Sequence, residues 1–375
     1  MEAQMIKRVH LPAIFCLCIV LCMLSACNGK KLNTTNETGD TLYLRHARNL
    51  CIIEYKNRTE VCIRNPWDTT RVLHHYVLSE TETEVADGKT LVRVPLRKAG
   101  VFTSVHCALL NELGCTDAIA GVCELEYIHL PCIQEAVREG RITDLGSGLE
   151  PNVERIMDLQ PDALMPTPFE NSGGYGRLER MGIPLIECAD YMEISALACA
   201  EWMRFYGRLF GKGHEADSLF FCVEENYKKM KRLVENVGHR PKLISERPSS
   251  GHWYMPCGGS TLGGLFHDAG ADYLFSDMKG TGSAPLSMEH VLDRALEADV
   301  WLVKHHGKLT RQDICKDHPM LQKIPARIWL CDTSESLYYE EASFHPEWLL
   351  GNLIQILHPE VGIPSEKNYF CLLEE

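Results

Sequence analysis

The chain has 375 residues, 45% of them hydrophobic, which is enough for two domains with cores of ordinary size. Its formal net charge is −13, from 38 basic and 51 acidic residues. An acidic surface repels nucleic acid and anionic lipid, and no run of Lys or Arg offsets it. The composition therefore argues against a nucleic-acid-binding protein.

The first 27 residues have the pattern of an export signal. Lys7 and Arg8 precede an uncharged apolar run at 11–26, which is shorter than the ~20 residues that span a bilayer and is typical of a signal-peptide core. The run ends in "LSAC", which resembles the lipobox of bacterial lipoproteins, and this resemblance implies that Cys27 receives the lipid. A short membrane anchor or a buried helix is the alternative.

A polar stretch at 28–40 follows, and its composition predicts a flexible tether that reaches roughly 45 Å when fully extended. Residues 41–91 are rich in strand patterns, with "NLCIIEYKN" and "TEVCIRNPW" on either side of a turn. We expect this strand-rich segment to pack on the domain that comes after it.

Cysteine is abundant but forms no metal-binding or disulfide pattern. Of the 17 cysteines, 13 follow the export segment, and they are scattered, odd in number and without a CxxC pair. We interpret them mainly as small buried hydrophobic residues, although an exported protein can oxidise some of them.

Helix and strand patterns alternate in two regions, 92–190 and 241–345, which predicts two α/β lobes with mostly parallel sheets. Between them, 191–240 shows no strand pattern and is predicted to be a helical linker region, with a break at "GKGH", 211–214. Residues 346–375 are predicted to form a closing helix and tail.

One unit occurs in both lobes. "LEPNVERIMDLQPDALM" in the first is echoed by "LSMEHVLDRALEADVWLV" in the second. Each copy has a helix-capping residue, a glutamate two positions later, an apolar-periodic helix, and an aspartate before a buried strand. The matched positions are Asn152 and Ser287, Glu154 and Glu289, and Asp162 and Asp299.

These motifs, with "GGSTLGGLFHDAGADYLF" and "HPEWLLGNLIQILHP", resemble the helical-backbone (class III) periplasmic substrate-binding proteins of ABC importers for cobalamin, ferric siderophores and haem. The resemblance covers about residues 90 to 360. It implies two Rossmann-like lobes joined by a long linker helix, here expected within about 193–212. The ligand cleft lies between the lobes, and only a modest opening motion is expected.

The resemblance also implies a function. The chain would be the lipid-anchored solute-binding component of an ABC import system, without enzyme activity or a cofactor of its own. It would capture an iron chelate (siderophore or haem) or a corrinoid, whose iron or cobalt belongs to the ligand, and deliver it to the permease dimer. We expect a monomer in the bacterial cell envelope, its body in the periplasm or outside the cytoplasmic membrane.

Glu154 and Glu289 match the two family positions, one in each lobe, that dock into arginine-lined sockets on the permease dimer. A carboxylate on each lobe suits bidentate pairing with arginine. Acidic residues are also common in the first turn of a helix because they complement its dipole, which is the alternative interpretation.

Loops at the carboxyl ends of parallel strands are expected to hold the ligand. Four of the candidates are aromatic residues on glycine-rich loops, suited either to stack on a flat ligand or to cover their own lobe. Arg247 and Lys304 would pair with carboxylates or phosphates, and the amides of "GGSTLGG" suit an anion. The candidates are Thr103, Ser104, His106, Phe169 and Tyr175 in the first lobe, and Arg247, Trp253, Tyr254, Ser260, Thr261, Lys304 and His305 in the second.

Metal chemistry is the remaining question. His252, His305 and His306 are candidate ligands for iron or cobalt, with a surface or supporting role as the alternative. No set of ligands for a free metal ion can be assembled, and the loop "GSGLEP" lacks the aromatic residue of cobalamin-binding relatives. The competing functions are a metal-dependent hydrolase using the histidines and Glu246, and a surface binding protein without transport. The chain contains neither GxSxG nor HExxH.

Overall fold

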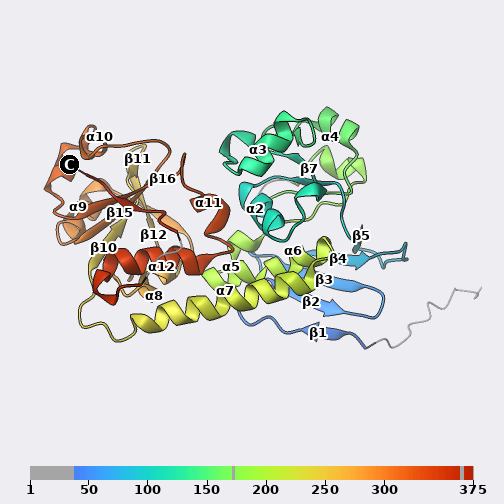
Figure 1. Ribbon diagram of the computed structural model, residues 1–375, viewed down its shortest axis with the longest axis horizontal. Helices are drawn as coiled ribbons and strands as arrows, with labels where there is room; N and C mark the ends of the chain where they lie inside the picture. Colours follow the sequence, from blue (N-terminus) through green and yellow to red (C-terminus); the bar gives the residue numbers. More distant parts are fainter. Residues whose placement is uncertain (1–37, 171–173, 364–366, 375) are drawn as a thin grey trace, which may run out of the picture. The chain divides into compact units, whose positions relative to one another are not determined.

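The computed structural model describes residues 38–170, 174–363 and 367–374 (Figure 1). The chain falls into two units, Met1–Gly39 and Asp40–Glu375, and the second holds all the secondary structure described below. The predicted signal peptide, Cys27 and nearly all of the predicted tether lie outside the described residues. Among the described helices, none has both the length and the apolar character needed to cross a membrane.

The strand-rich segment forms its own five-stranded sheet, in the order β1-β2-β3-β4-β5. All pairs are antiparallel except β4 and β5. Its inner face is buried against α6 (Met203–Leu209) and the segment near 185–187, where the Tyr76 hydroxyl donates to Leu185 O. The strands are β1 (Asp40–Leu42), β2 (Leu50–Glu54), β3 (Thr59–Arg64), β4 (Val72–Ser79) and β5 (Thr90–Arg93).

The first lobe is a four-stranded parallel sheet in the order β8-β7-β6-β9. Its strands are β6 (Ala99–Val101), β7 (Ile119–Val122), β8 (Thr143–Asp144) and β9 (Ala163–Met165). Its α-helices are α2 (Ser104–Glu112), α3 (Pro131–Arg138) and α4 (Val153–Leu159), with 3-10 turns η1 (Thr116–Ala118), η2 (Leu125–Tyr127) and η3 (Leu178–Met181).

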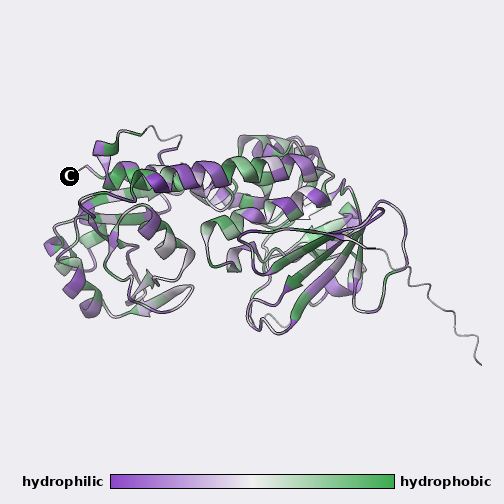
Figure 2. Cartoon of the chain, turned by 90° about the horizontal axis from the view of Figure 1, so that it is seen from below, coloured by the Kyte–Doolittle hydropathy of each residue, from purple (hydrophilic) through white to green (hydrophobic). Residues whose placement is uncertain are grey.

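The linker region is helical, but the long helix lies later than the sequence predicted. Residues 193–212 form two short helices, α5 (Ala196–Glu201) and α6, after the turn η4 (Asp190–Met192). The long helix is α7 (Gly213–Leu233), whose 21 residues span about 30 Å. Its buried residues follow a helical period, and hydrophobic and hydrophilic residues alternate along it in Figure 2.

The helices α6 and α7 are separate elements because the chain turns between them, and they pack closely against each other at one glycine. A Cβ at Gly207 would lie 2.4 Å from the Ala216 side chain and 2.7 Å from Lys212 O. Only glycine therefore lets the two helices approach this closely, and the chain turns at Gly211, which has a φ of +71°.

The second lobe has a five-stranded sheet in the order β13-β10-β15-β16-β17, parallel except for β17. A small antiparallel sheet, β11-β12-β14, accompanies it. The strands are β10 (Lys242–Ser245), β11 (Pro248–Ser249), β12 (His252–Pro256), β13 (Asp272–Tyr273), β14 (Ser283–Leu286), β15 (Val300–His305), β16 (Arg327–Asp332) and β17 (Cys371–Leu372). The helices are α8 (Thr261–Asp268), α9 (Met288–Ala295), α10 (Arg311–Cys315), α11 (Tyr338–Glu341) and α12 (Pro346–Leu357), with η5 (Pro319–Lys323) and η6 (Pro359–Val361).

The two lobes repeat one arrangement, β7-β6-β9 in the first and β13-β10-β15 in the second. The matched aspartates accept equivalent backbone hydrogen bonds in the two lobes. The Asp162 carboxylate accepts from Arg97 N and Lys98 N at 2.7 and 2.9 Å, just before β6. The Asp299 carboxylate accepts from Lys242 N at 2.8 Å, at the start of β10. Each aspartate thus sets the register between neighbouring parallel strands.

The two lobes are joined through α11 and α12 as well as through the linker. His345 Nε2 lies 2.6 Å from Glu112 Oε2 of α2, and its Nδ1 lies 2.9 Å from Glu347 Oε1 of α12. The ring stacks on Trp348 at 3.7 Å. Burial opposes the charge on His345, but the hydrogen bonds with Glu112 and Glu347 outweigh it and raise its pKa to about 9.

We predict that this cluster makes stability depend on pH. Since the pKa of His345 is higher in the folded state than its unfolded value of about 6.5, its stabilisation is complete below pH 6.5 and disappears as pH rises through 9. The unfolding free energy should fall by roughly 3 kcal/mol over this range. Urea titrations of the wild type and His345→Gln at several pH values check this. The same change of unfolding free energy with pH in both proteins would contradict this prediction.

Candidate ligand-binding site

A cavity of about 790 Å³ opens at the carboxyl ends of the first lobe's strands. This volume is within the range of small-molecule sites. Phe102 and Thr103 follow β6, Glu124 follows β7, and Thr167 and Phe169 follow β9. The position is the one that parallel α/β sheets favour for ligands.

Two hydroxyl groups of this cavity are buried without a hydrogen-bond partner in the described part of the chain, Thr167 Oγ1 and Tyr175 OH. Burial and the nearby Glu187 carboxylate raise the pKa of Tyr175, so it stays protonated and can donate. Buried polar groups are rarely left unpaired because an unmade bond costs about 1–3 kcal/mol. Both residues line the cavity, but their hydroxyl oxygens are buried in its wall, where an ordered water or a ligand group that enters the wall would pair with them.

The loop after β7 gives the cavity a fixed wall. Glu124 has a left-handed backbone, with a φ of +53°. Its Oε1 accepts from Gly148 N at 2.7 Å and from Ser147 Oγ at 3.0 Å. The carboxylate thus ties the β7 loop to the loop before α4, and Arg177 adds a positive group to the lining.

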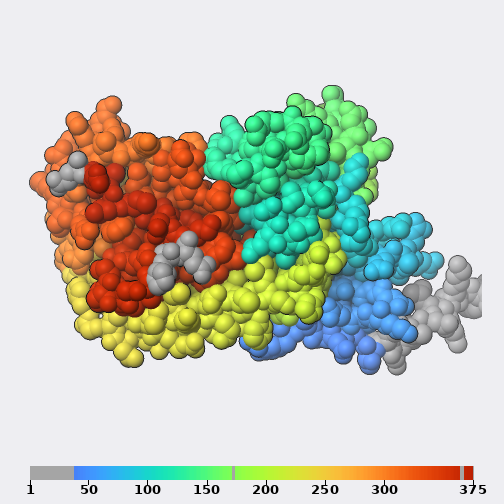
Figure 3. Space-filling view, in the orientation of Figure 1, coloured from blue at the N-terminus to red at the C-terminus, as the bar shows by residue number. Residues whose placement is uncertain are grey.

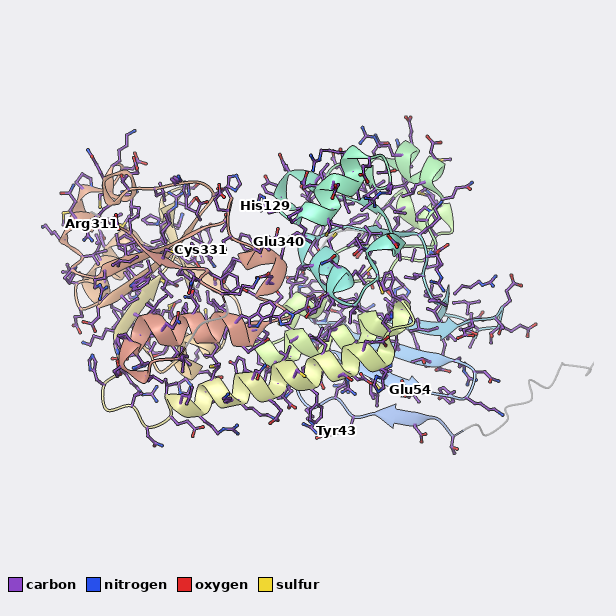
Figure 4. All side chains as sticks on the ribbon, viewed as in Figure 1. Tyr43, Glu54, His129, Arg311, Cys331 and Glu340 are labelled. Atoms are coloured by element: carbon purple, nitrogen blue, oxygen red, sulfur yellow. The ribbon has the colours of Figure 1, made fainter. Side chains whose placement is uncertain are left out.

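A second cavity, of about 310 Å³, lies between the lobes. Tyr127 and His129 from the first lobe meet His306 and Tyr339 from the second. His129 N donates to Glu340 Oε1 at 3.0 Å, and the His129 and His306 rings are 6.3 Å apart. Figure 4 labels His129 and Glu340, and Figure 3 shows the lobes in contact along this boundary.

Charged groups of the second lobe gather at the same strand ends. Lys304 Nζ lies 2.8 Å from Glu246 Oε1. Burial opposes the charge on Lys304, but the interactions with Tyr338 and Glu246 outweigh it and raise its pKa. Arg247 Nη2 lies 3.1 Å from His305 Nδ1. Burial, followed by the Arg247 charge, lowers the pKa of His305, which is therefore a neutral imidazole near pH 7.

Several predicted residues are brought together by this geometry. Thr103, Phe169 and Tyr175 line the first-lobe cavity, while Lys304 and His305 line the interlobe cavity. Thr261 and Lys304 also line a neighbouring hollow of about 280 Å³, although the Thr261 hydroxyl donates to Glu193 O. Ser104 begins α2, and His252 and Tyr254 lie on β12; none of the three is among the residues that line these cavities.

Three of the ligand predictions are wrong because the side chains are used inside the protein. Trp253 is 0% exposed, donates from Nε1 to Ser245 O at 3.0 Å and packs against Trp301. His106 is 3% exposed and pairs with Asp190 at 3.0 Å. Ser260 is the buried N-cap of α8.

The strand geometry explains the error at Trp253. Side chains alternate between the two faces of β12, so Trp253 points into the core and Tyr254, 49% exposed, points out. The glycine-rich sequence next to β12 had suggested that the side chains of Trp253 and Tyr254 are both exposed.

Other lining residues were missed individually. Thr167, Tyr127 and His129 lie in segments that follow first-lobe strands, which strand order predicted to face the ligand, but these side chains were not selected within them. Tyr339 and Glu340 lie on α11, and no pattern in "SLYYEE" indicated that this helix reaches the other lobe.

Among the residues that the structure describes, no three His, Cys, Asp or Glu side chains converge where they could hold a metal ion. The metal-dependent hydrolase therefore gains no supporting observation.

Glu154 and Glu289 are both exposed in the first turn of a helix, after the caps Asn152 and Ser287. These positions leave both carboxylates available to a partner.

Comparison with known proteins identifies the class. The chain belongs to the periplasmic binding protein family, whose sequence model matches residues 102–328. It is 24% identical to an uncharacterized lipoprotein of Methanocaldococcus jannaschii, over 98% of this chain and 96% of that protein. It is 20% identical to an uncharacterized protein of the same organism, over 77% of this chain and 90% of that protein.

Solved structures share the fold. A periplasmic heme binding protein from Pseudomonas aeruginosa superposes with a TM-score of 0.58 at 14% identity, covering 75% of this chain and 99% of that one. A periplasmic binding protein from Veillonella parvula gives 0.57 at 17% identity, with 74% and 97% covered. An ABC-type Fe3+-hydroxamate transport protein from Saccharomonospora viridis gives 0.52 at 18%, with 70% and 93% covered. The protein is thus a periplasmic binding protein by family, with a solute-binding role, and it shares the fold of these solved structures.

We predict that Trp253→Ala lowers the unfolding free energy by about 3–5 kcal/mol, because it removes a fully buried indole. Tyr254→Ala on the same strand is the control and should change it by less than about 0.5 kcal/mol. Chemical denaturation measures both. A stable Trp253→Ala protein with weakened ligand binding would contradict this prediction and show that Trp253 belongs to the ligand site.

Proposed function

We propose that the protein captures a metal chelate, namely an iron siderophore, haem or a corrinoid, and delivers it to an ABC permease. The observation that supports this most directly is the first-lobe cavity with its two unpartnered hydroxyls. An apolar wall with a few placed polar groups is typical of sites for compact organic ligands. The names of the structural relatives, which include heme and Fe3+-hydroxamate, agree with this ligand class.

The ligand is tested directly with purified protein. Absorbance spectra and mass analysis of co-purified material should detect a metal chelate. Titration with haem, a ferric hydroxamate and cobalamin should raise the unfolding free energy by about 2.7 kcal/mol at 100 times Kd for the true ligand, without turnover. If none of the three binds, the metal-chelate class is wrong.

We predict that Tyr175→Phe weakens binding of the ligand so identified about 5- to 10-fold, since one hydrogen bond contributes about 1–1.5 kcal/mol. The unfolding free energy should not fall, because the variant removes a buried hydroxyl that makes no hydrogen bond in the described part of the chain. Tyr43→Phe, at an exposed position, is the control. Isothermal titration measures the affinities, and an unchanged Kd would remove Tyr175 from the site.

Docking to the permease is proposed to use Glu154 and Glu289. Each is exposed at the same corner of its lobe, and a carboxylate there can pair with arginine on each permease subunit. We predict that Glu154→Arg with Glu289→Arg abolishes uptake while the ligand Kd stays the same.

A matched variant separates docking from charge. Glu135→Arg with Glu225→Arg makes the same charge change at exposed positions on α3 and α7. It should transport normally in the same uptake assay. Normal uptake by the first double variant, or loss of its ligand binding, would show that the docking assignment is wrong.

The lipid anchor at Cys27 is part of the proposal. It is supported by the "LSAC" sequence and by the relative described as a lipoprotein, which matches nearly the whole chain. The anchor would hold the receptor in the cell envelope, near the permease it serves.

A further inference from the structure

The sheet β1–β5 lies outside the region matched by the family model and carries an unassigned pair of thiols. Strand register places Cys51 of β2 directly opposite Cys62 of β3, and Cys62 directly opposite His75 of β4. Their neighbours Ile52 and Val61 are 0% exposed on the inner face. Because strand residues alternate, both thiols belong to the outer face. Both are free and partly exposed.

The spacing of the two cysteines suits a disulfide. Arg64 N donates to Asn49 O, and Tyr55 N donates to Arg58 O. By alternation along the hairpin, Cys51 and Cys62 also occupy a hydrogen-bonded position, where Cα atoms are about 5.5 Å apart. This separation lies in the range of natural disulfides, about 4.4–6.8 Å. Burial and the neighbouring Cys51 raise the pKa of Cys62, in agreement with the closeness of the two thiols.

We propose that Cys51 and Cys62 form a reversible disulfide by exchange with a disulfide-bearing oxidant, either a small molecule or a protein. One thiolate attacks the oxidant, releases one of its thiols and forms a mixed disulfide. The other cysteine then attacks this bond, closes the Cys51–Cys62 bridge and releases the second thiol. The pair loses two protons and two electrons, and the oxidant becomes two thiols.

The same geometry makes the bridge easy to reduce. Directly opposite residues have Cβ atoms about 4.5–5.5 Å apart, whereas a relaxed disulfide needs about 3.8 Å. Closing the bond must therefore draw the two strands together, and such strain favours reduction. The pair is thus a redox-sensitive modification site on an extension of the family fold rather than a permanent staple.

The experiment uses the full chain, purified in detergent. Oxidised glutathione is added at several ratios to reduced glutathione, followed by alkylation under denaturing conditions. We expect the loss of two thiols per chain, the mass loss of two hydrogens, and one protease fragment that joins residues 51 and 62. Excess reduced glutathione should restore both thiols.

Three variants complete the test. Cys51→Ser and Cys62→Ser should each abolish the joined fragment, while Cys222→Ser, which removes an exposed thiol on α7, should leave it unchanged. Joining of residue 51 or 62 to a different cysteine, or failure to join at any ratio, overturns the proposal. Protection of the two thiols by a metal ion that a chelator removes would also overturn it.

Discussion

In each lobe, hydrogen bonding between parallel strands places the carboxyl ends of those strands at one edge, and the ligand cavities follow from this constraint. Phe102 and Thr167 come from two neighbouring strands of the first lobe, and Lys304 from a strand of the second. The aspartates at 162 and 299 hold the strand entries in register, far from the cavities. The repeated unit therefore places a set of loops at the carboxyl edge of the parallel strands in each lobe.

Buried carboxylates hold the N-terminal extension against the linker. Glu201, 0% exposed, accepts from Arg45 N, His46 N and Ala47 N at 2.7–2.9 Å. Glu193 continues this pattern with Asn49 N at 2.9 Å. A carboxylate without its partners would be costly in such a place, so β1–β2 and the linker helices behave as one piece. The contacts of His345 connect the second lobe to α2 of the first in addition.

Much of the fold could be predicted from the sequence because it is coded locally. The caps Asn152 and Ser287, the helices that follow them and the β2–β3 hairpin are confirmed. The long helix was misplaced: the predicted break at 211–214 does separate α6 from α7, but the linker helix was assigned to the segment before the break, and the long helix follows it. For the candidate site, Thr103, Phe169 and Tyr175 were predicted and line the first-lobe cavity, whereas the predicted Trp253 and His106 are buried.

The sequence by itself determined the order of most elements and the corner on which each exposed glutamate stands, because these depend on short-range patterns of polarity and capping. The class of protein followed from the resemblance of its motifs to a known family. Only the tertiary structure decided that Tyr175 and Thr167 face a cavity, that α11 reaches the other lobe, and which face of β12 is covered. Those outcomes depend on which segments, distant along the chain, come to lie against one another. No local pattern carries that information.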